Sequence, residues 1–252
     1  MRNIPLVALA LALWSSNASA AQGLRTVYLN FDGVTLNRST TVDDATVNVS
    51  SIVNSATEVI PAMTTSGLID VGGLSRQQVI DRVLADLEAI FEPYHVDFVT
   101  SRPVSAPYPM IVFGGDSLTV TGSAGLSGIA LSDCDDTMPS NIIFVFPSGL
   151  RVGDLAEIAA EESAHAFGLG HTIDTSDIMF PVIQVAIPTA FGSGTIPDGS
   201  GCPPSATSQD SHATLLSIIG GRPDASVPAL TGPAAVLLMT VLIVHGVRAA
   251  GG

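Results

Sequence analysis

The chain has 252 residues and a formal net charge of −14, because its 23 aspartates and glutamates outnumber its 9 lysines and arginines. This balance excludes nucleic acid as a partner, since phosphates are bound by basic side chains, and it suits an extracellular protein. The length allows one sizeable domain or two small ones.

Residues 1–20 have the pattern of a secretory signal peptide. A charged start at Arg2 is followed by an apolar run over residues 4–14 and by the small residues Ala18, Ser19 and Ala20. The run is too short for a stop-transfer helix, and its leucine and alanine content does not favour the alternative, a first core strand. We therefore expect cleavage after Ala20 and export of the remaining chain.

The next part of the chain is expected to contain a strand, a helix and several further strands. Alternating β-branched residues predict a strand at 26–31, and the polar residues 35–73 predict a loop with one strand. A helix begins at Ser75, with Gln78 in a capping box, and ends before Pro93. Further strands are expected at 96–100, at 110–113, at 129–131 as a short exposed strand, and at 141–146 as a buried central strand.

A second helix is expected to open at Asp154, where Glu157 is a capping-box candidate. An apolar cluster at 215–219 predicts a final short helix, and residues 224–228 form a linker. This order of strand, helix, strands and helix describes an α+β or α/β domain with a mixed sheet.

Residues 226–252 are expected to form a hydrophobic tail. Its apolar run, residues 234–244, is shorter than the ~20 residues of a membrane span, follows Pro233 and has Arg248 beyond it. The pattern is typical both of the sorting tails of bacterial surface proteins and of simple C-terminal anchors, and both interpretations stay open. Either one places the tail in a membrane and leaves residues 21–225 as the folded domain.

The only two cysteines, Cys134 and Cys202, predict one disulfide in an oxidising compartment. This bond would tie the segment before the second helix to the loop after it.

The second helix carries the candidate metal ligands, in the run Glu161-Glu162-Ser163-Ala164-His165-Ala166-Phe167-Gly168-Leu169-Gly170-His171. Glu161 and His165 are four residues apart, so they lie on one face of a helix. A glycine that ends the helix and a short turn return His171 to that face. Three protein ligands with an open fourth position make a catalytic zinc site, in which Glu162 is placed to act as base.

The alternative is that both histidines pack in the core and that Glu161 is a solvated carboxylate. It is less favoured, because two histidines and a glycine at this spacing, beside two glutamates, seldom arise together by chance.

The run resembles the motif of the metzincin clan of zinc endopeptidases, H-E-x-x-H-x-x-G-x-x-H followed by a methionine turn. Met179, with Asp177 just before it, matches the methionine, and Glu161 stands where the clan has its first histidine. The resemblance covers residues 25–182. It implies a mixed, mainly parallel sheet with an antiparallel edge strand near residues 123–132, a backing helix and an active-site helix.

The resemblance also implies a set of roles. Glu161, His165 and His171 would bind Zn²⁺, and Glu162 would be the catalytic base. Met179 would form the hydrophobic floor of the site, and a peptide substrate would lie antiparallel along the edge strand. Because a carboxylate ligand makes zinc a weaker Lewis acid, slow hydrolysis is expected.

A second ion, Ca²⁺, is suggested by the acidic loop Asp133, Asp135 and Asp136, since calcium prefers oxygen ligands. The spacing does not match a twelve-residue calcium loop, so a solvated acidic turn is the favoured interpretation.

Together these observations predict an exported zinc endopeptidase that is held at a bacterial cell envelope by its tail, or secreted after tail processing. The alternatives are a catalytically inactive metzincin-like surface protein that binds a protein or glycan, and an adhesive protein whose histidines only pack.

Overall fold

The computed structural model describes residues 23–105, 107–134, 136–183, 190–197 and 199–223. The expected signal peptide, residues 1–20, and the expected tail, residues 226–252, lie outside the described residues. The chain divides into the units Met1–Gly221 and Arg222–Gly252, and everything below concerns the first. Within the described ranges, the structure contains no helix that is both long enough and apolar enough to cross a membrane.

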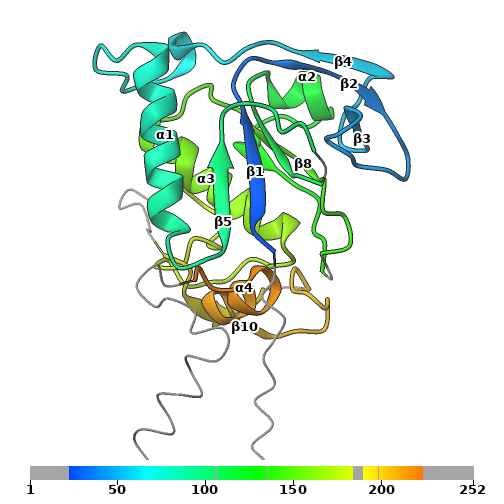
Figure 1. The fold of residues 1–252 in the computed structure, drawn as a ribbon, viewed down its shortest axis with the longest axis vertical. Coiled ribbons are helices and arrows are strands. Elements are labelled where there is room, and N and C mark those ends of the chain that lie inside the picture. Colours follow the sequence, from blue (N-terminus) through cyan, green and yellow to red (C-terminus); the bar gives the residue numbers. More distant parts are fainter. Residues whose placement is uncertain (1–22, 106, 135, 184–189, 198, 224–252) are drawn as a thin grey trace, which may run out of the picture. The chain divides into compact units, whose positions relative to one another are not determined.

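A five-stranded sheet forms the centre of this unit (Figure 1). Its strand order is β5-β1-β6-β8-β7, and the first four strands run parallel while β7 pairs antiparallel with β8 at the edge. The strands are β1 (Arg25–Asn30), β5 (Val96–Val99), β6 (Met110–Phe113), β7 (Gly128–Ile129) and β8 (Ile142–Val145). The predicted α+β class, with a mainly parallel mixed sheet and an antiparallel edge strand, is therefore confirmed.

The middle strands are buried on both faces. All four residues of β6 and of β8 are buried, as continuous apolar runs in parallel sheets require. Successive side chains alternate between two cores: Ile111 and Ile143 face the helices, whereas Met110 and Ile142 face the opposite side.

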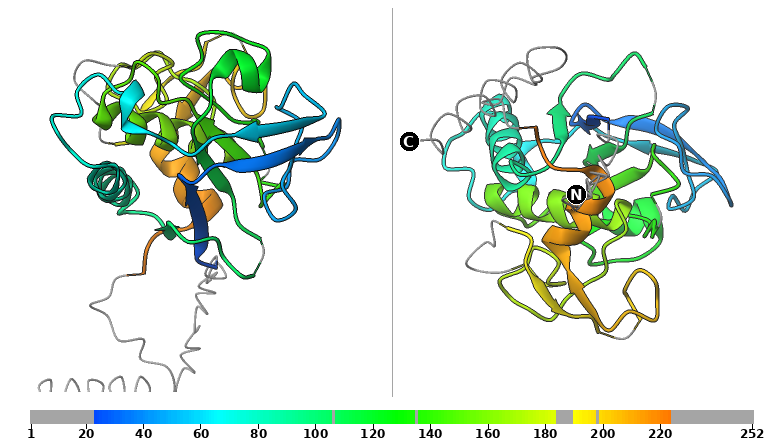
Figure 2. Two further views of the ribbon diagram at one scale, coloured as in Figure 1. Left: turned by 90° about the horizontal axis from the view of Figure 1, so that it is seen from above. Right: turned by 60° about the horizontal axis from the view of Figure 1, so that its bottom comes forward.

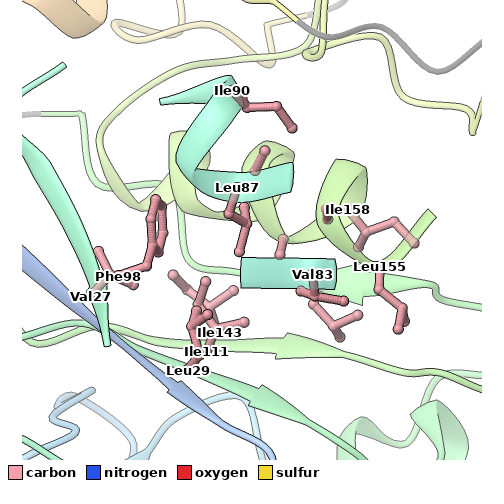
Figure 3. Close-up of a cluster of buried hydrophobic side chains, with 14 of the residues drawn as sticks. Val27, Leu29, Val83, Leu87, Ile90, Phe98, Ile111, Ile143, Leu155 and Ile158 are labelled. Atoms are coloured by element: carbon pink, nitrogen blue, oxygen red, sulfur yellow. The ribbon is translucent and has the colours of Figure 1, made fainter. Parts of the chain in front are cut away.

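Two long helices, α1 (Arg76–Ile90) and α3 (Val152–Ala166), cover one face of the sheet (Figure 3). In Figure 3, Val83 and Leu87 of α1 point toward Leu29 and Ile111 of the sheet, beside Ile158 of α3. These helices are the predicted backing helix and the helix that carries the motif.

The starts of the two helices differ in how well they were predicted. The capping box of α1 is confirmed, since the backbone N–H of Gln78 donates to Ser75 Oγ at 3.3 Å and the backbone N–H of Ser75 donates to Gln78 Oε1 at 2.9 Å. The expected start of α3 at Asp154 is wrong. Asp154 instead lies inside the first turn, where its Oδ2 accepts from the backbone N–H of Arg151 at 2.8 Å.

The other face of the sheet is covered by a second, three-stranded sheet and by a short helix from later in the chain. The three strands lie where a loop with one strand was expected over residues 35–73. Leu36 and Ile60 point inward from this sheet and pack in the second core. The elements are β2 (Val34–Arg38), β3 (Val49–Ser50), β4 (Thr57–Ile60), the 3₁₀ helix η1 (Thr65–Gly67) and α2 (Ser117–Thr121).

The last described segments form β9 (Ser193–Thr195), β10 (Ser208–Asp210) and α4 (Ser211–Ile219). Figure 2 shows α4 at the end of the central sheet where β1 begins, and the backbone N–H of His95 donates to the carbonyl of Gly220 there. The predicted final helix exists but starts earlier than residue 215. The predicted disulfide Cys134–Cys202 is present.

Candidate metal centre

The last turns of α3 bring Glu161 and His165 to one point, as their four-residue spacing predicts. The helix ends at Ala166, and Gly168 then takes a left-handed conformation with φ +93°. A Cβ at Gly168 would lie 2.9 Å from the carbonyl oxygen of Asp133. Glycine is therefore required both by the backbone conformation and by the loop that packs against it.

The turn after Gly168 returns His171 to the same point. The Nε2 atoms of His165 and His171 are 3.1 Å apart, and His171 Nε2 is 3.4 Å from Glu161 Oε1. One ligand atom from each of these three residues lies within 4.8 Å of the others. Among the described residues, this is the one cluster of three or more acidic, histidine or cysteine side chains that could hold a metal ion.

These distances fit a zinc ion. Ligand atoms about 2.0–2.1 Å from a tetrahedral ion are about 3.3 Å apart, close to the 3.1 Å and 3.4 Å that separate His171 Nε2 from its two neighbours. Two imidazoles and a carboxylate are also an ordinary donor set for zinc. The residues present therefore fit the metal that the sequence predicts.

The surroundings of His165 prepare it as a ligand. Its Nδ1 lies 2.8 Å from the carbonyl oxygen of Leu169, so Nδ1 carries the proton and Nε2 presents its lone pair to the site. Burial, together with the nearby His171, lowers the pKa of His165 to about 4. The imidazole is therefore neutral at pH 7, as metal binding requires.

The two neighbouring carboxyl groups differ in position. Glu161 points to the histidines, and burial raises its pKa against the opposing effect of His171. Glu162 is 8% exposed. Burial raises its pKa well above the ordinary value, the charge of Glu161 adds to this rise, and a hydrogen bond from the backbone of Ala130 opposes it.

Both glutamates and both histidines line a cleft of about 590 Å³ between the edge strand and the segment that follows the site. One wall is the strand β7 with its flanking residues, and the other includes Pro181, Val182 and Ile183. Glu162 touches the first wall, since a Cβ at Gly128 would lie 2.7 Å from Glu162 Oε1.

The methionine predicted to form a turn, Met179, is fully buried and belongs to the core beneath the helices. Its carbonyl accepts a hydrogen bond from the backbone N–H of Thr172, the residue after His171, at 2.9 Å. The segment 172–179 therefore folds back on itself directly after the last candidate ligand.

Sequence reasoning did not identify the polar contacts that hold this segment. Asp177 is fully buried and accepts four hydrogen bonds, from Thr172 Oγ1, the backbone N–H of Met179, the backbone N–H of Gly192 and Ser211 Oγ. Gln209 contacts both backbone groups of Gly170 at 2.9 Å. Gly170, which Gln209 contacts, and two of the four donors to Asp177, Gly192 and Ser211, lie 15 to 39 residues away along the chain, so no local pattern marks these contacts.

The acidic loop does not assemble a calcium site from its described residues. Asp136 pairs with Arg25, while Asp133 accepts hydrogen bonds from Thr137 Oγ1 at 3.0 Å and from the backbone N–H of Met138 at 2.6 Å. Asp135 lies outside the described residues. Calcium therefore stays a prediction that these contacts do not support.

Comparison with known proteins adds little to this geometry. No protein-family model matches the chain, and no curated protein matches it. One similar solved structure is metalloproteinase-II from Bacteroides fragilis, at 10% sequence identity and a TM-score of 0.38. The match covers 69% of this chain and 51% of that one, so the chain spans about half the length of that protein.

Proposed function

We propose that this chain is a zinc-dependent endopeptidase whose metal is held by Glu161, His165 and His171. The observation that carries the proposal is the convergence of these side chains, with His171 Nε2 at 3.1 Å and 3.4 Å from the other two ligand atoms, on the floor of an open cleft.

The residues around the metal have the chemistry that peptide hydrolysis needs. Bound zinc would supply a Lewis acid that lowers the pKa of a water toward ~7 and polarises the scissile carbonyl. Glu162 would accept a proton from the attacking water on a carboxyl oxygen and pass it to the leaving amine. Burial and the charge of Glu161 raise the pKa of Glu162, which makes its ionised carboxylate a stronger base.

The edge strand β7 offers a place for the substrate. It pairs with β8 on one side and, as the last strand of the five, has its other edge toward the cleft that residues 125–130 line. An extended peptide that pairs antiparallel with this edge places its backbone across the floor of the cleft. The substrate class is therefore a peptide or protein in an extended conformation.

The second candidate function is an inactive surface protein of the same fold that binds a protein or glycan. One observation favours it: the ligand at position 161 is a carboxylate rather than an imidazole, which weakens zinc as a Lewis acid. Zinc bound without peptide cleavage would support this candidate.

The test is metal analysis and peptidase assay of purified residues 21–225. We expect one zinc per chain, lost in Glu161→Ala and in His165→Ala, and chelator-sensitive cleavage of an unstructured protein. Glu162→Gln is the matched control: it should keep the zinc and lose about 10²–10⁴-fold in rate, since it removes only the base. If the purified protein binds no zinc, the endopeptidase is excluded, and a metal-free surface protein of this fold or a protein whose histidines only pack remains.

We further propose that the chain is exported and held at a bacterial envelope. The support is the signal-peptide pattern of residues 1–20, the apolar tail at 226–252 and the disulfide Cys134–Cys202, which requires an oxidising compartment. Fractionation of cells that express the full chain tests this: recovery in the cytoplasm with both thiols reduced would contradict it.

A further inference from the structure

We propose that Gln209 is a positioning residue that holds His171 in the geometry needed for zinc. The proposal deepens the site described above and rests on the proposed function only for its link to the metal. Gln209 lies on β10, 39 residues after Gly170.

The contact between Gln209 and Gly170 uses both ends of the amide. The backbone N–H of Gly170 donates to Gln209 Oε1 at 2.9 Å, and Gln209 Nε2 donates to the carbonyl of Gly170, also at 2.9 Å. Gly170 is the residue immediately before His171 and is buried. The amide of Gln209 therefore fixes both peptide units of Gly170, including the one that leads into His171 and sets the direction of its side chain.

Gln209 is itself held by a buried chain of hydrogen bonds. Its Nε2 also donates to Ser211 Oγ at 3.0 Å, and Ser211 Oγ donates to Asp177 Oδ2 at 2.7 Å. A hydroxyl has one proton to donate. Because Ser211 gives it to the carboxylate, its oxygen must accept from Gln209, which fixes the orientation of the amide.

The same chain of hydrogen bonds reaches the other side of His171. Thr172 Oγ1 donates to Asp177 Oδ2 at 3.1 Å, so both sequence neighbours of His171 are anchored to one buried network. Of the three candidate ligands, His171 is the only one outside α3. Its position therefore depends on this network, whereas Glu161 and His165 are positioned by the helix.

The close packing around Gly170 makes any other conformation of this turn costly. A Cβ at Gly170 would lie 2.7 Å from the Cα of Gly201, next to Cys202 of the disulfide. The turn is thus enclosed between two segments, and the amide of Gln209 satisfies the backbone groups that this enclosure removes from water.

The experiment compares Gln209→Ala and Gln209→Glu with a control on the same strand, Ser208→Ala, whose side chain is exposed. Glutamate keeps the shape and the acceptor but cannot donate to Gly170 or to Ser211. We expect the zinc dissociation constant, measured by chelator competition, to rise about 10–100-fold in both Gln209 variants and to stay within twofold of wild type in Ser208→Ala. The visible spectrum of the Co²⁺-substituted protein should change in the same two variants.

A readout without metal separates this proposal from the proposed function. In the metal-free protein, hydrogen exchange of the Gly170 amide should be at least tenfold faster in Gln209→Ala than in wild type, and it should be unchanged in Ser208→Ala. Unchanged exchange at Gly170 would overturn the proposal whether or not the wild type binds zinc. Faster exchange with an unchanged zinc dissociation constant would also overturn it, because His171 would then not depend on the amide. Absence of zinc from the wild type would contradict the proposed function alone.

Discussion

Gly128→Ala tests the contact between the edge strand and the proposed base. The added Cβ would lie 2.5 Å from Ile158 Cγ2, 2.7 Å from Glu162 Oε1 and 2.8 Å from Glu162 Cγ. Non-bonded carbon atoms prefer about 3.5–4.0 Å, so Ile158 and Glu162 must move by about 1 Å, or β7 must move away from the helix.

We expect this displacement to affect catalysis more than metal binding. A misplacement of about 1 Å can cost about 100-fold in rate, and overpacking costs about 1–3 kcal/mol of unfolding free energy. Zinc should be retained, because none of the three atoms that the new methyl group would contact belongs to Glu161, His165 or His171.

The assays are kcat on a protein substrate, zinc content, and denaturant unfolding monitored by circular dichroism. Gly67→Ala is the control, since its Cβ would come no closer than 3.4 Å to another atom, Cα of Ser148. A Gly128→Ala protein with wild-type kcat would refute the argument that the edge strand positions Glu162. Loss of zinc in this variant would show that the contact supports the metal ligands instead.

Three further predictions concern stability. Replacing both Cys134 and Cys202 by serine should lower the unfolding free energy by about 4 kcal/mol. This is the loop-closure contribution of a disulfide whose cysteines are 68 residues apart. Equal denaturation midpoints for the oxidised wild type and the variant would contradict this. Asp177→Ala should cost about 3–5 kcal/mol of unfolding free energy, because four donors, three of them in buried contacts, lose their carboxyl acceptor. Asp177→Asn, which keeps one carbonyl oxygen, should cost less in the same denaturant melts. Burial raises the pKa of Asp43, although the hydrogen bond from the backbone N–H of Ile142 opposes this rise. The contribution of Asp43 to the unfolding free energy is therefore fully present at a pH below its unfolded-state pKa, near 3.9, and it is lost as the pH rises through the folded-state pKa. Asp43→Asn should therefore gain stability relative to wild type on going from pH 3.5 to pH 7, and a difference independent of pH would exclude this origin.

The parts of the fold that the sequence predicted are those with local signals. The buried strands β6 and β8 are continuous apolar runs, and α1 has helical spacing and a capping box, so each could be identified from its own residues. The candidate ligands were identified for the same reason. Glu161 and His165 are one helical turn apart, and a single glycine turn separates them from His171.

The missed features depend on distant partners. The strands β2, β3 and β4 have five, two and four residues, which is too short for a period of two to stand out. Aspartate and glutamine usually lie at the protein surface. Here Asp177 instead binds Ser211, 34 positions away, and Gln209 binds Gly170, 39 positions away. Pairings of this kind arise from tertiary packing and leave no trace in a window of ten or fifteen residues.

The distance of Gln209 along the chain has a consequence for the order of folding. Glu161 and His165 are positioned as soon as α3 forms. His171 is positioned only after β10 has been synthesised and has closed the long loop back to Gly170. We therefore expect zinc uptake to be among the last events of refolding. If zinc were captured before the amides of β10 gain protection in pulsed hydrogen exchange, the last ligand would have to be positioned without them.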